Sequence, residues 1–188
     1  MKRILIANRG EIASRIIRTC KKMGLETVAV YSEADKSLEY VREADWSICI
    51  GKAPVNLSYL RIDQIIDAAL QYDADGIHPG YGFLSENGDF AEKVEEAGLT
   101  FIGPKPEILR LMGDKITARK TMANAGIPVL PASSGAVASL SEALKVAKEI
   151  GYPVMVKASG GGGGIGMALC RNEKELETNF ASLKKKAE

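Results

Sequence analysis

The sequence contains little of what metal centres and disulfide frameworks require. Among its 188 residues there is one histidine, His78, and there are three cysteines, Cys20, Cys49 and Cys170. A single histidine excludes a site built from several histidines. The cysteines lie far apart and form no C-x-x-C pair, which argues against structural zinc and against a disulfide framework. We therefore expect each cysteine to fill core space as a small apolar residue.

The chain also lacks long apolar runs and an excess of one charge. No hydrophobic stretch reaches membrane-spanning length, and the first apolar run ends at Asn8, which is too short for a signal peptide. The formal net charge is +1, and hydrophobic and charged residues make up 46% and 26% of the chain. These values are typical of a globular protein with no general attraction to nucleic acid or membranes, and we expect a cytoplasmic location.

Short apolar strands alternate with amphipathic helices through the first half of the chain. Strands are expected at residues 3–7, 27–31, 46–50, 74–77 and 100–102. The helix after the first strand is expected to bury one face, made of Ile12, Ile16, Cys20 and Met23. Ser58 and Asn87 are expected to cap two further helices. The alternation predicts an α/β domain with a parallel sheet that helices cover on both faces.

The pattern changes after Pro104. A short helix is expected to end near Gly113, and Asp114 is expected to cap a connector helix. A capping box and an asparagine cap then predict two more helices, which start at Ser139 and Asn172. Strand-like segments flank residues 158–166 between these two helices. This second part of the chain therefore predicts a small α+β unit built around a hairpin.

Five consecutive glycines occupy residues 160–164. Glycine has no side chain and a large entropic cost of ordering, so such a run does not serve packing. Its N–H groups can form a nest for phosphate oxygens, with Lys157 adding a positive charge; the alternative is a flexible linker. The strand-like flanks favour the phosphate loop. Because Ile165 follows the glycines, where a Walker loop has Lys and Ser/Thr, we expect a hairpin lid over a triphosphate.

A second polar loop spans residues 78–87 and follows the expected fourth strand. Ligands of open parallel sheets gather outside the carboxyl ends of the strands, which makes this loop a functional candidate. The turn after the first strand, residues 8–11, does not fit G-x-G-x-x-G and so does not support dinucleotide binding. His78 taken alone is more simply a hydrogen-bonded structural residue than a general base.

Five motifs occur together and in order along the chain. They are IANRGEIA at 6–13, IHPGYGFLSEN at 77–87, FIGP at 101–104, LMGDK at 111–115 and KAS with its glycines at 157–164. With these motifs the whole chain resembles the N-terminal part of biotin carboxylase, a component of acetyl-CoA, propionyl-CoA and pyruvate carboxylases. The resemblance implies an ATP-grasp ligase, in which ATP and bicarbonate give carboxyphosphate and the carboxyl group passes to N1 of biotin.

The resemblance also implies a domain plan. It places a Rossmann-like pre-ATP-grasp domain at residues 1–112 and a connector helix at 113–130. An incomplete ATP-grasp lid subdomain is then expected at 131–188. A biotin carboxyl carrier, a carboxyltransferase component and a second copy of the chain are the implied partners.

By position, Lys115 and Lys157 resemble the two lysines of the family that contact the nucleotide. Gly163 and Gly164 resemble loop residues that lie over the phosphates. Ile165 stands where many members have Arg or Lys, so one cation at the tip of the loop is missing. No residue here matches a catalytic residue or a magnesium ligand of the family, because these are expected beyond residue 188.

Two functional readings follow from this resemblance. In the first, the chain is part of an ATP-dependent biotin carboxylase and is inactive alone. In the second, it is a non-catalytic folding and dimerisation module with weak or no nucleotide binding. Arg18 and Lys22 are candidates for the dimer contacts of such a module, although a solvated helix face is the simpler role for them.

Overall fold

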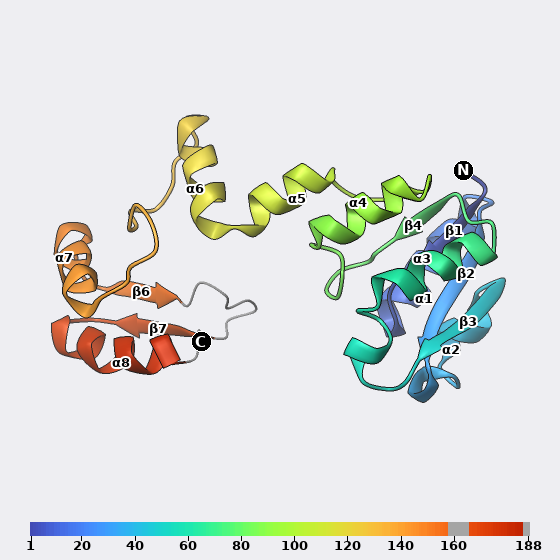
Figure 1. Ribbon diagram of the computed structural model, residues 1–188, viewed down its shortest axis with the longest axis horizontal. Helices are drawn as coiled ribbons and strands as arrows, with labels where there is room; N and C mark the ends of the chain where they lie inside the picture. Colours follow the sequence, from blue (N-terminus) through green and yellow to red (C-terminus); the bar gives the residue numbers. More distant parts are fainter. Residues whose placement is uncertain (158–165, 186–188) are drawn as a thin grey trace. The chain divides into compact units, whose positions relative to one another are not determined.

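The computed structural model describes residues 1–157 and 166–185. The chain divides into two compact units, Met1–Gly113 and Asp114–Glu188 (Figure 1). Each described hydrophobic cluster lies within one unit, so each unit is described by itself. Three residues that the sequence singles out, Gly163, Gly164 and Ile165, lie outside the described residues.

The first unit is built on a five-stranded parallel sheet. In chain order its strands are β1 (Arg3–Ile6), β2 (Glu26–Ser32), β3 (Trp46–Gly51), β4 (Gly76–His78) and β5 (Thr100–Phe101). Their spatial order is β3-β2-β1-β4-β5, and every neighbouring pair is parallel. The expected α/β class is confirmed. The carboxyl ends of all five strands therefore meet at one edge of the sheet.

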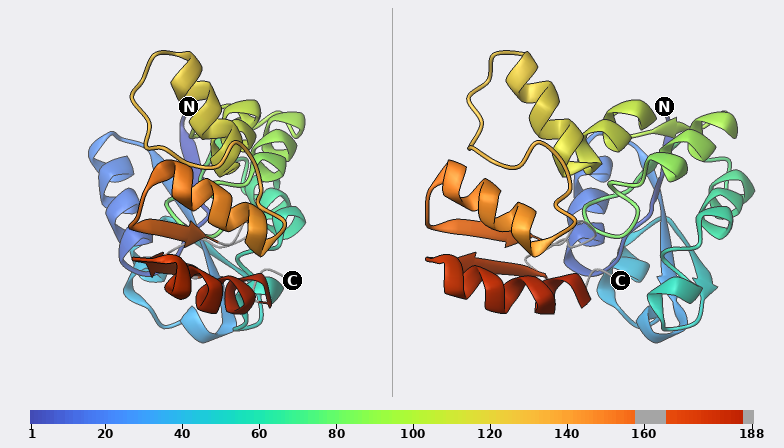
Figure 2. Two further views of the ribbon diagram at one scale, coloured as in Figure 1. Left: turned by 90° about the vertical axis from the view of Figure 1, so that its left-hand side faces the viewer. Right: turned by 60° about the vertical axis from the view of Figure 1, so that its left-hand side comes forward.

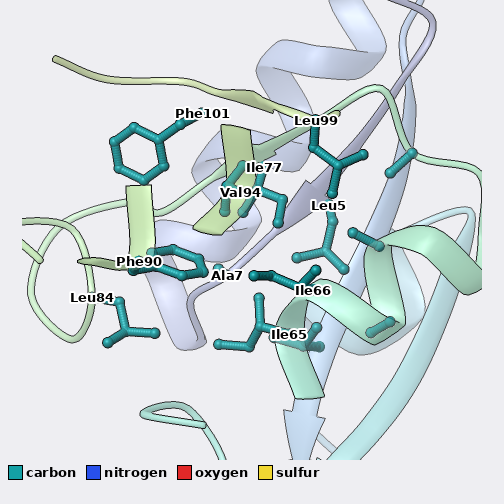
Figure 3. Packing of buried hydrophobic residues seen from close by; sticks show 14 of the residues in the cluster. Leu5, Ala7, Ile65, Ile66, Ile77, Leu84, Phe90, Val94, Leu99 and Phe101 are labelled. Atoms are coloured by element: carbon teal, nitrogen blue, oxygen red, sulfur yellow. The ribbon is translucent and has the colours of Figure 1, made fainter. Parts of the chain in front are cut away.

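Helices cover both faces of this sheet because side chains along a strand alternate between the faces. Ile4 and Ile6 face α1 (Gly10–Lys22) and α2 (Glu39–Glu43), while Leu5 faces α3 (Ile62–Gln71) and α4 (Gly88–Glu96). Figure 2 shows the sheet between these helices, and Figure 3 shows the cluster on the α3 and α4 side, where Leu5, Ile65 and Phe90 meet. The unit closes with α5 (Pro106–Gly113).

Three local expectations for this unit are wrong. Met23 is 67% exposed, because α1 ends before it and it serves as the C-cap residue. Ser58 does not cap α3: Arg61 is the N-cap residue, and the Ser58 hydroxyl donates to the carbonyl of Pro54. Cys49 is exposed, because β3 is an edge strand, whereas Cys20 is buried as expected.

In its described residues, 114–157 and 166–185, the second unit contains three helices and a hairpin. Its elements are α6 (Lys115–Asn124), α7 (Leu140–Ile150), β6 (Val154–Lys157), β7 (Met167–Cys170) and α8 (Glu173–Lys185). The expected caps are confirmed, since Asp114, Ser139 and Asn172 each accept a backbone N–H of the following first turn. Buried Ala147, Cys170 and Leu176 form its core. Within residues 1–157 and 166–185, no helix combines the length and apolar character that crossing a membrane requires.

Candidate functional site

The hairpin of the second unit has two different faces. The cross-strand pairs Val154–Cys170 and Val156–Ala168 form one face and pack with residues of α7 and α8. The pairs Met155–Leu169 and Lys157–Met167 alternate with them and therefore form the other face. Among the described residues, the hydrophobic cluster of this unit contains none of the four residues of that second face.

The second face is a mainly apolar surface with one cation. Met155, Met167 and Leu169 are 49%, 44% and 43% exposed, which is unusual for large apolar side chains gathered on neighbouring strands. Lys157 is exposed at the end of β6 and is paired in register with Met167. Such a surface suits a ligand with a flat apolar ring and a negatively charged group. We call residues Met155, Lys157, Met167 and Leu169 the open hairpin face.

Lys115, the other lysine singled out in the sequence, is the first residue of α6. The carboxylate of Asp114 accepts a hydrogen bond from the backbone N–H of Thr117 at 2.7 Å and so fixes the start of this helix. Hydrogen bonds from Thr117 lower the pKa of the Asp114 carboxyl. Lys115 is exposed at this helix start and belongs to the same unit as Lys157.

In the first unit, the loop of residues 78–87 is held to the turn after β1. The side-chain amide of Asn8 donates hydrogen bonds of 2.8 Å to the carbonyls of Pro79 and Tyr81, and the Tyr81 hydroxyl donates to Glu11. Asn8 is buried, so its bond to Pro79 is shielded from water, whereas the bond between Tyr81 and Glu11 is exposed. Gly80 must be glycine here, because a Cβ at this position would lie 2.6 Å from Nδ2 of Asn8.

His78 ends β4 and occupies a hydrogen-bonded structural position. Its Nδ1 accepts the backbone N–H of Gly80 at 3.0 Å. Burial lowers the pKa of His78, and the nearby positive charge of Arg15 lowers it further. Both effects favour the neutral imidazole, which is the form that accepts a hydrogen bond at Nδ1.

A charged network lies at the same edge of the sheet. The carboxylate of Asp35 accepts two hydrogen bonds from Arg9, one from the Tyr59 hydroxyl at 2.5 Å and one from Ser32 at 3.1 Å. The hydrogen bonds from Arg9 lower the pKa of Asp35 to about 2 against the opposing effect of burial, and those from Tyr59 and Ser32 contribute. Asp35 is therefore ionised at neutral pH.

Neither unit offers a described metal site. Within residues 1–157 and 166–185, no group of three or more His, Cys, Asp or Glu side chains could hold a metal ion. A polar cavity of about 270 Å³, lined by Lys2, Arg3, Asp73 and Asp75, lies at the amino edge of the sheet. Open parallel sheets bind their ligands at the opposite edge, so this cavity is not the candidate site.

Several of these residues were missed from sequence. The strands of the hairpin were expected, but the exposed face they create was not. The sequence does contain a signal for this face. Side chains alternate along residues 154–157 and 167–170, and the hairpin register pairs Met155 with Leu169, so these two residues lie on the same face. Asp35 and Tyr59 carry no comparable local signal, since 24 residues separate them.

Two family models match the chain, one in each unit. The first is described as "Biotin carboxylase, N-terminal domain" and matches residues 1–109. The second is described as "Carbamoyl-phosphate synthase L chain, ATP binding domain" and matches residues 114–188.

Curated relatives and solved structures agree with these matches. A biotin carboxylase of Halalkalibacterium halodurans is 55% identical over 99% of this chain and 41% of its own length. The 2-oxoglutarate carboxylase small subunit of Hydrogenobacter thermophilus is 50% identical over 95% of this chain and 38% of its own length.

Among solved structures, a biotin carboxylase–β,γ-ATP complex from Campylobacter jejuni has a TM-score of 0.94 and 54% identity, covering 99% of this chain and 42% of the other. The biotin carboxylase domain dimer of the Hydrogenobacter enzyme, in complex with MgADP, ADP and bicarbonate, has a TM-score of 0.93 and 49% identity, with 99% and 41% covered. The chain thus spans about two-fifths of the length of the relatives it matches.

Proposed function

Because the chain belongs to the biotin carboxylase family, we propose that it is part of an enzyme that carboxylates biotin at the expense of ATP. In this reaction a bicarbonate oxygen attacks the γ-phosphorus of ATP, and ADP leaves. The resulting carboxyphosphate gives its carboxyl group to N1 of biotin, which loses its proton, and phosphate is released. Within this enzyme we assign nucleotide binding to the second unit.

The open hairpin face is the observation that supports this assignment. It combines three exposed apolar side chains with the cation of Lys157, at the strand that leads into the glycine run. Adenine is a flat ring that apolar side chains can cover, and the phosphates are anions that a lysine neutralises. The ATP-binding family model covers this unit, and the 54% identical Campylobacter structure is a complex with a β,γ-ATP compound.

Six residues are proposed to contact the nucleotide, four at the phosphates and two at the base. Lys157 and Lys115 would neutralise negative charge on the phosphates, and the backbone N–H groups of Gly163 and Gly164 would donate to phosphate oxygens. Fixed donors of this kind stabilise the charge that develops during phosphoryl transfer. Met155 and Met167 would cover the base.

Methionine methyl groups give a direct test, because two of the six methionines lie on the open hairpin face. The 188-residue chain is labelled with ¹³C-methyl methionine and titrated with ATP and magnesium. We expect the signals of Met155 and Met167 to shift saturably, with a dissociation constant on the order of 1 mM, since a partial site covers only part of the ligand. The signals of Met1 and Met23, in the first unit, should stay in place.

Two controls separate the contacts. Lys157→Met should weaken binding of both ATP and inorganic triphosphate, whereas Lys145→Met, on exposed Lys145 of α7, should change neither. Inorganic triphosphate should leave the methyl signal of Met155 close to its free position, because it has no ring. If the methyl signals of Met155 and Met167 do not shift at an ATP concentration ten times the expected dissociation constant, the assignment is refuted. The non-catalytic module is then favoured.

We also propose the partners that the family implies. The solved domain of the Hydrogenobacter enzyme is a dimer, and Arg18 and Lys22 are exposed on α1, where a second copy could bind. A biotin carboxyl carrier would present the biotin, and a carboxyltransferase component would use it. Relatives include 2-oxoglutarate and pyruvate carboxylases. A role in an acetyl-CoA carboxylase of fatty acid biosynthesis is therefore one of several roles that differ in the final acceptor of the carboxyl group. The cytoplasmic location remains a prediction from the sequence.

A further inference from the structure

One network joins the loops that follow four of the parallel strands. Arg9 follows β1, Asp35 follows β2, Tyr59 follows β3 and Phe83 follows β4. Because these strands are parallel neighbours in the sheet, the four loops meet at its carboxyl edge. The network therefore lies at the edge where open parallel sheets bind their ligands. At this edge the residues of the network contact one another.

Tyr59 is the centre of this network and is fixed at both ends. Its hydroxyl donates to Asp35 at 2.5 Å and accepts the backbone N–H of Ser32 at 2.9 Å. Its side chain is 1% exposed, so no water competes for these bonds. The hydroxyl of Tyr40 lies 3.1 Å away and completes the surroundings of the Tyr59 oxygen.

The ring of Tyr59 stacks on Phe83. The two ring centroids are 5.1 Å apart and the rings are nearly parallel, at 7°. Phe83 has a φ of 45°, a left-handed conformation that is costly for an aromatic residue and that persists only where its surroundings enforce it. The stack on an immobilised tyrosine supplies such an enforcing contact.

We infer that Tyr59, held by Asp35, is a positioning residue that fixes the loop of residues 80–85 at the carboxyl edge of the sheet. Asn8 holds the first half of this loop through the carbonyls of Pro79 and Tyr81, and Tyr59 holds the second half through Phe83. The inference does not depend on nucleotide binding, which is assigned to the other unit. It identifies the contacts that hold this loop at the carboxyl edge, where open parallel sheets bind their ligands.

Amide hydrogen exchange in the 188-residue chain tests this role. The backbone N–H of Ser85 bonds to the carbonyl of Gly82, and that of Gly80 bonds to His78, so both report on the loop. We expect Tyr59→Leu to speed exchange at Ser85, in the half of the loop that Tyr59 holds, at least tenfold more than exchange at Gly80, in the half that Asn8 holds, or at Leu5 in β1. Tyr59→Phe keeps the stack but loses the bond to Asp35, and its exchange at Ser85 should lie between those of wild type and Tyr59→Leu.

Phe101→Leu is the matched control. It removes an aromatic pair with Phe90, whose ring centroid lies 5.8 Å from that of Phe101 in the same unit, and leaves both rings of the Tyr59–Phe83 stack in place. Fluorescence of Trp46, the single tryptophan, measures the stability of the unit in each variant. Equal loop protection in Tyr59→Leu and Phe101→Leu, at equal stability, would overturn the inference.

Phe83→Leu covers the case in which Tyr59→Leu does not fold. Phe83 is half-buried, and its replacement removes the same stack from the loop side. The inference requires Ser85 to lose protection in this variant as well, more than Gly80 does. Wild-type protection in Phe83→Leu would contradict it, whatever Tyr59→Leu does.

Discussion

The guanidinium of Arg9 donates from Nε to Oδ2 of Asp35 at 2.7 Å and from Nη2 to Oδ1 of the same carboxylate. The side chain of Asp35 is only 7% exposed, while that of Arg9 is 42% exposed. A buried carboxylate is thus paired with a cation that still reaches solvent. This paired geometry makes the stability of the first unit depend on pH.

Asp35 should stabilise the fold above pH 4 and lose this contribution in acid. Its pKa is lowered to about 2 in the folded chain, against an ordinary value of about 4 when unfolded. The contribution is therefore fully present above the unfolded value and disappears as the pH falls through the folded value, by about 2 kcal/mol in total. Urea unfolding followed by Trp46 fluorescence between pH 6 and pH 2 measures it.

Asp35→Asn should show a smaller loss of stability over that same acid range, because the titrating group is gone. It should also be less stable than wild type at pH 7, since Arg9 loses its carboxylate partner. Asp67→Asn, at an exposed position of α3, is the control and should follow the wild-type pH curve. An unchanged pH dependence in Asp35→Asn would show that other groups carry the acid sensitivity.

Gly80→Ala and Gly82→Ala should differ in cost although the two glycines share a φ of 68°. A Cβ at Gly80 would lie 2.6 Å from the Asn8 amide, whereas a Cβ at Gly82 meets nothing within 4 Å. We expect Gly82→Ala to cost about 1 kcal/mol for its backbone conformation, and Gly80→Ala about 2–3 kcal/mol. Denaturant midpoints measured by Trp46 fluorescence compare the stability of the two variants. Equal losses of stability would mean that the Asn8 side chain shifts away from the new Cβ at no cost in free energy.

Leucines on the two sides of the hairpin unit should respond differently to the same substitution. Leu176 is 1% exposed in the core and Leu169 is 43% exposed on the open hairpin face. Leu176→Ala should cost about 3 kcal/mol, because a cavity remains, and Leu169→Ala less than about 1 kcal/mol. Urea unfolding followed by the methyl signals of Met155 and Met167 reports on this unit. A large loss of unfolding free energy in Leu169→Ala would show that other residues cover the open hairpin face.

Asn87→Ala should weaken the start of α4. The Asn87 side chain accepts the backbone N–H of Phe90 at 2.8 Å, and losing such a cap costs about 1 kcal/mol. Asn87→Asp keeps an acceptor oxygen and should restore most of the stability. Thermal unfolding of the three proteins, followed by Trp46 fluorescence, tests this; equal losses in both variants would point to the Asn87 amide N–H₂ group instead.

The sequence predicted the sheet and most helices because their signals are local. Alternating apolar strands, helix faces and the caps at Asn87 and Asp114 each depend on neighbouring residues. Short α2 escaped prediction because five residues show too little helical periodicity. Ser58 was misassigned because it ends a 3₁₀ turn, Val55–Leu57, and lies three residues before Arg61, the N-cap residue of α3; its hydroxyl therefore bonds backward to Pro54.

From the sequence we predicted only those parts of the candidate site whose residue types indicate their chemistry without knowledge of the fold. Lys157 and the glycine run were visible in the sequence, and their proposed roles in nucleotide binding remain predictions. The open hairpin face required the strand register, and the network required the fold, since Arg9 and Asp35 are separated by 26 residues. Arg9, Asp35, Tyr59 and Phe83 each follow a different strand, and the parallel sheet brings them to one edge.

The division of the chain after Gly113 has an evolutionary consequence. No described hydrophobic cluster contains residues from both sides of this point, and the two family models meet between residues 109 and 114. A crossover between genes at this junction would carry each core over intact.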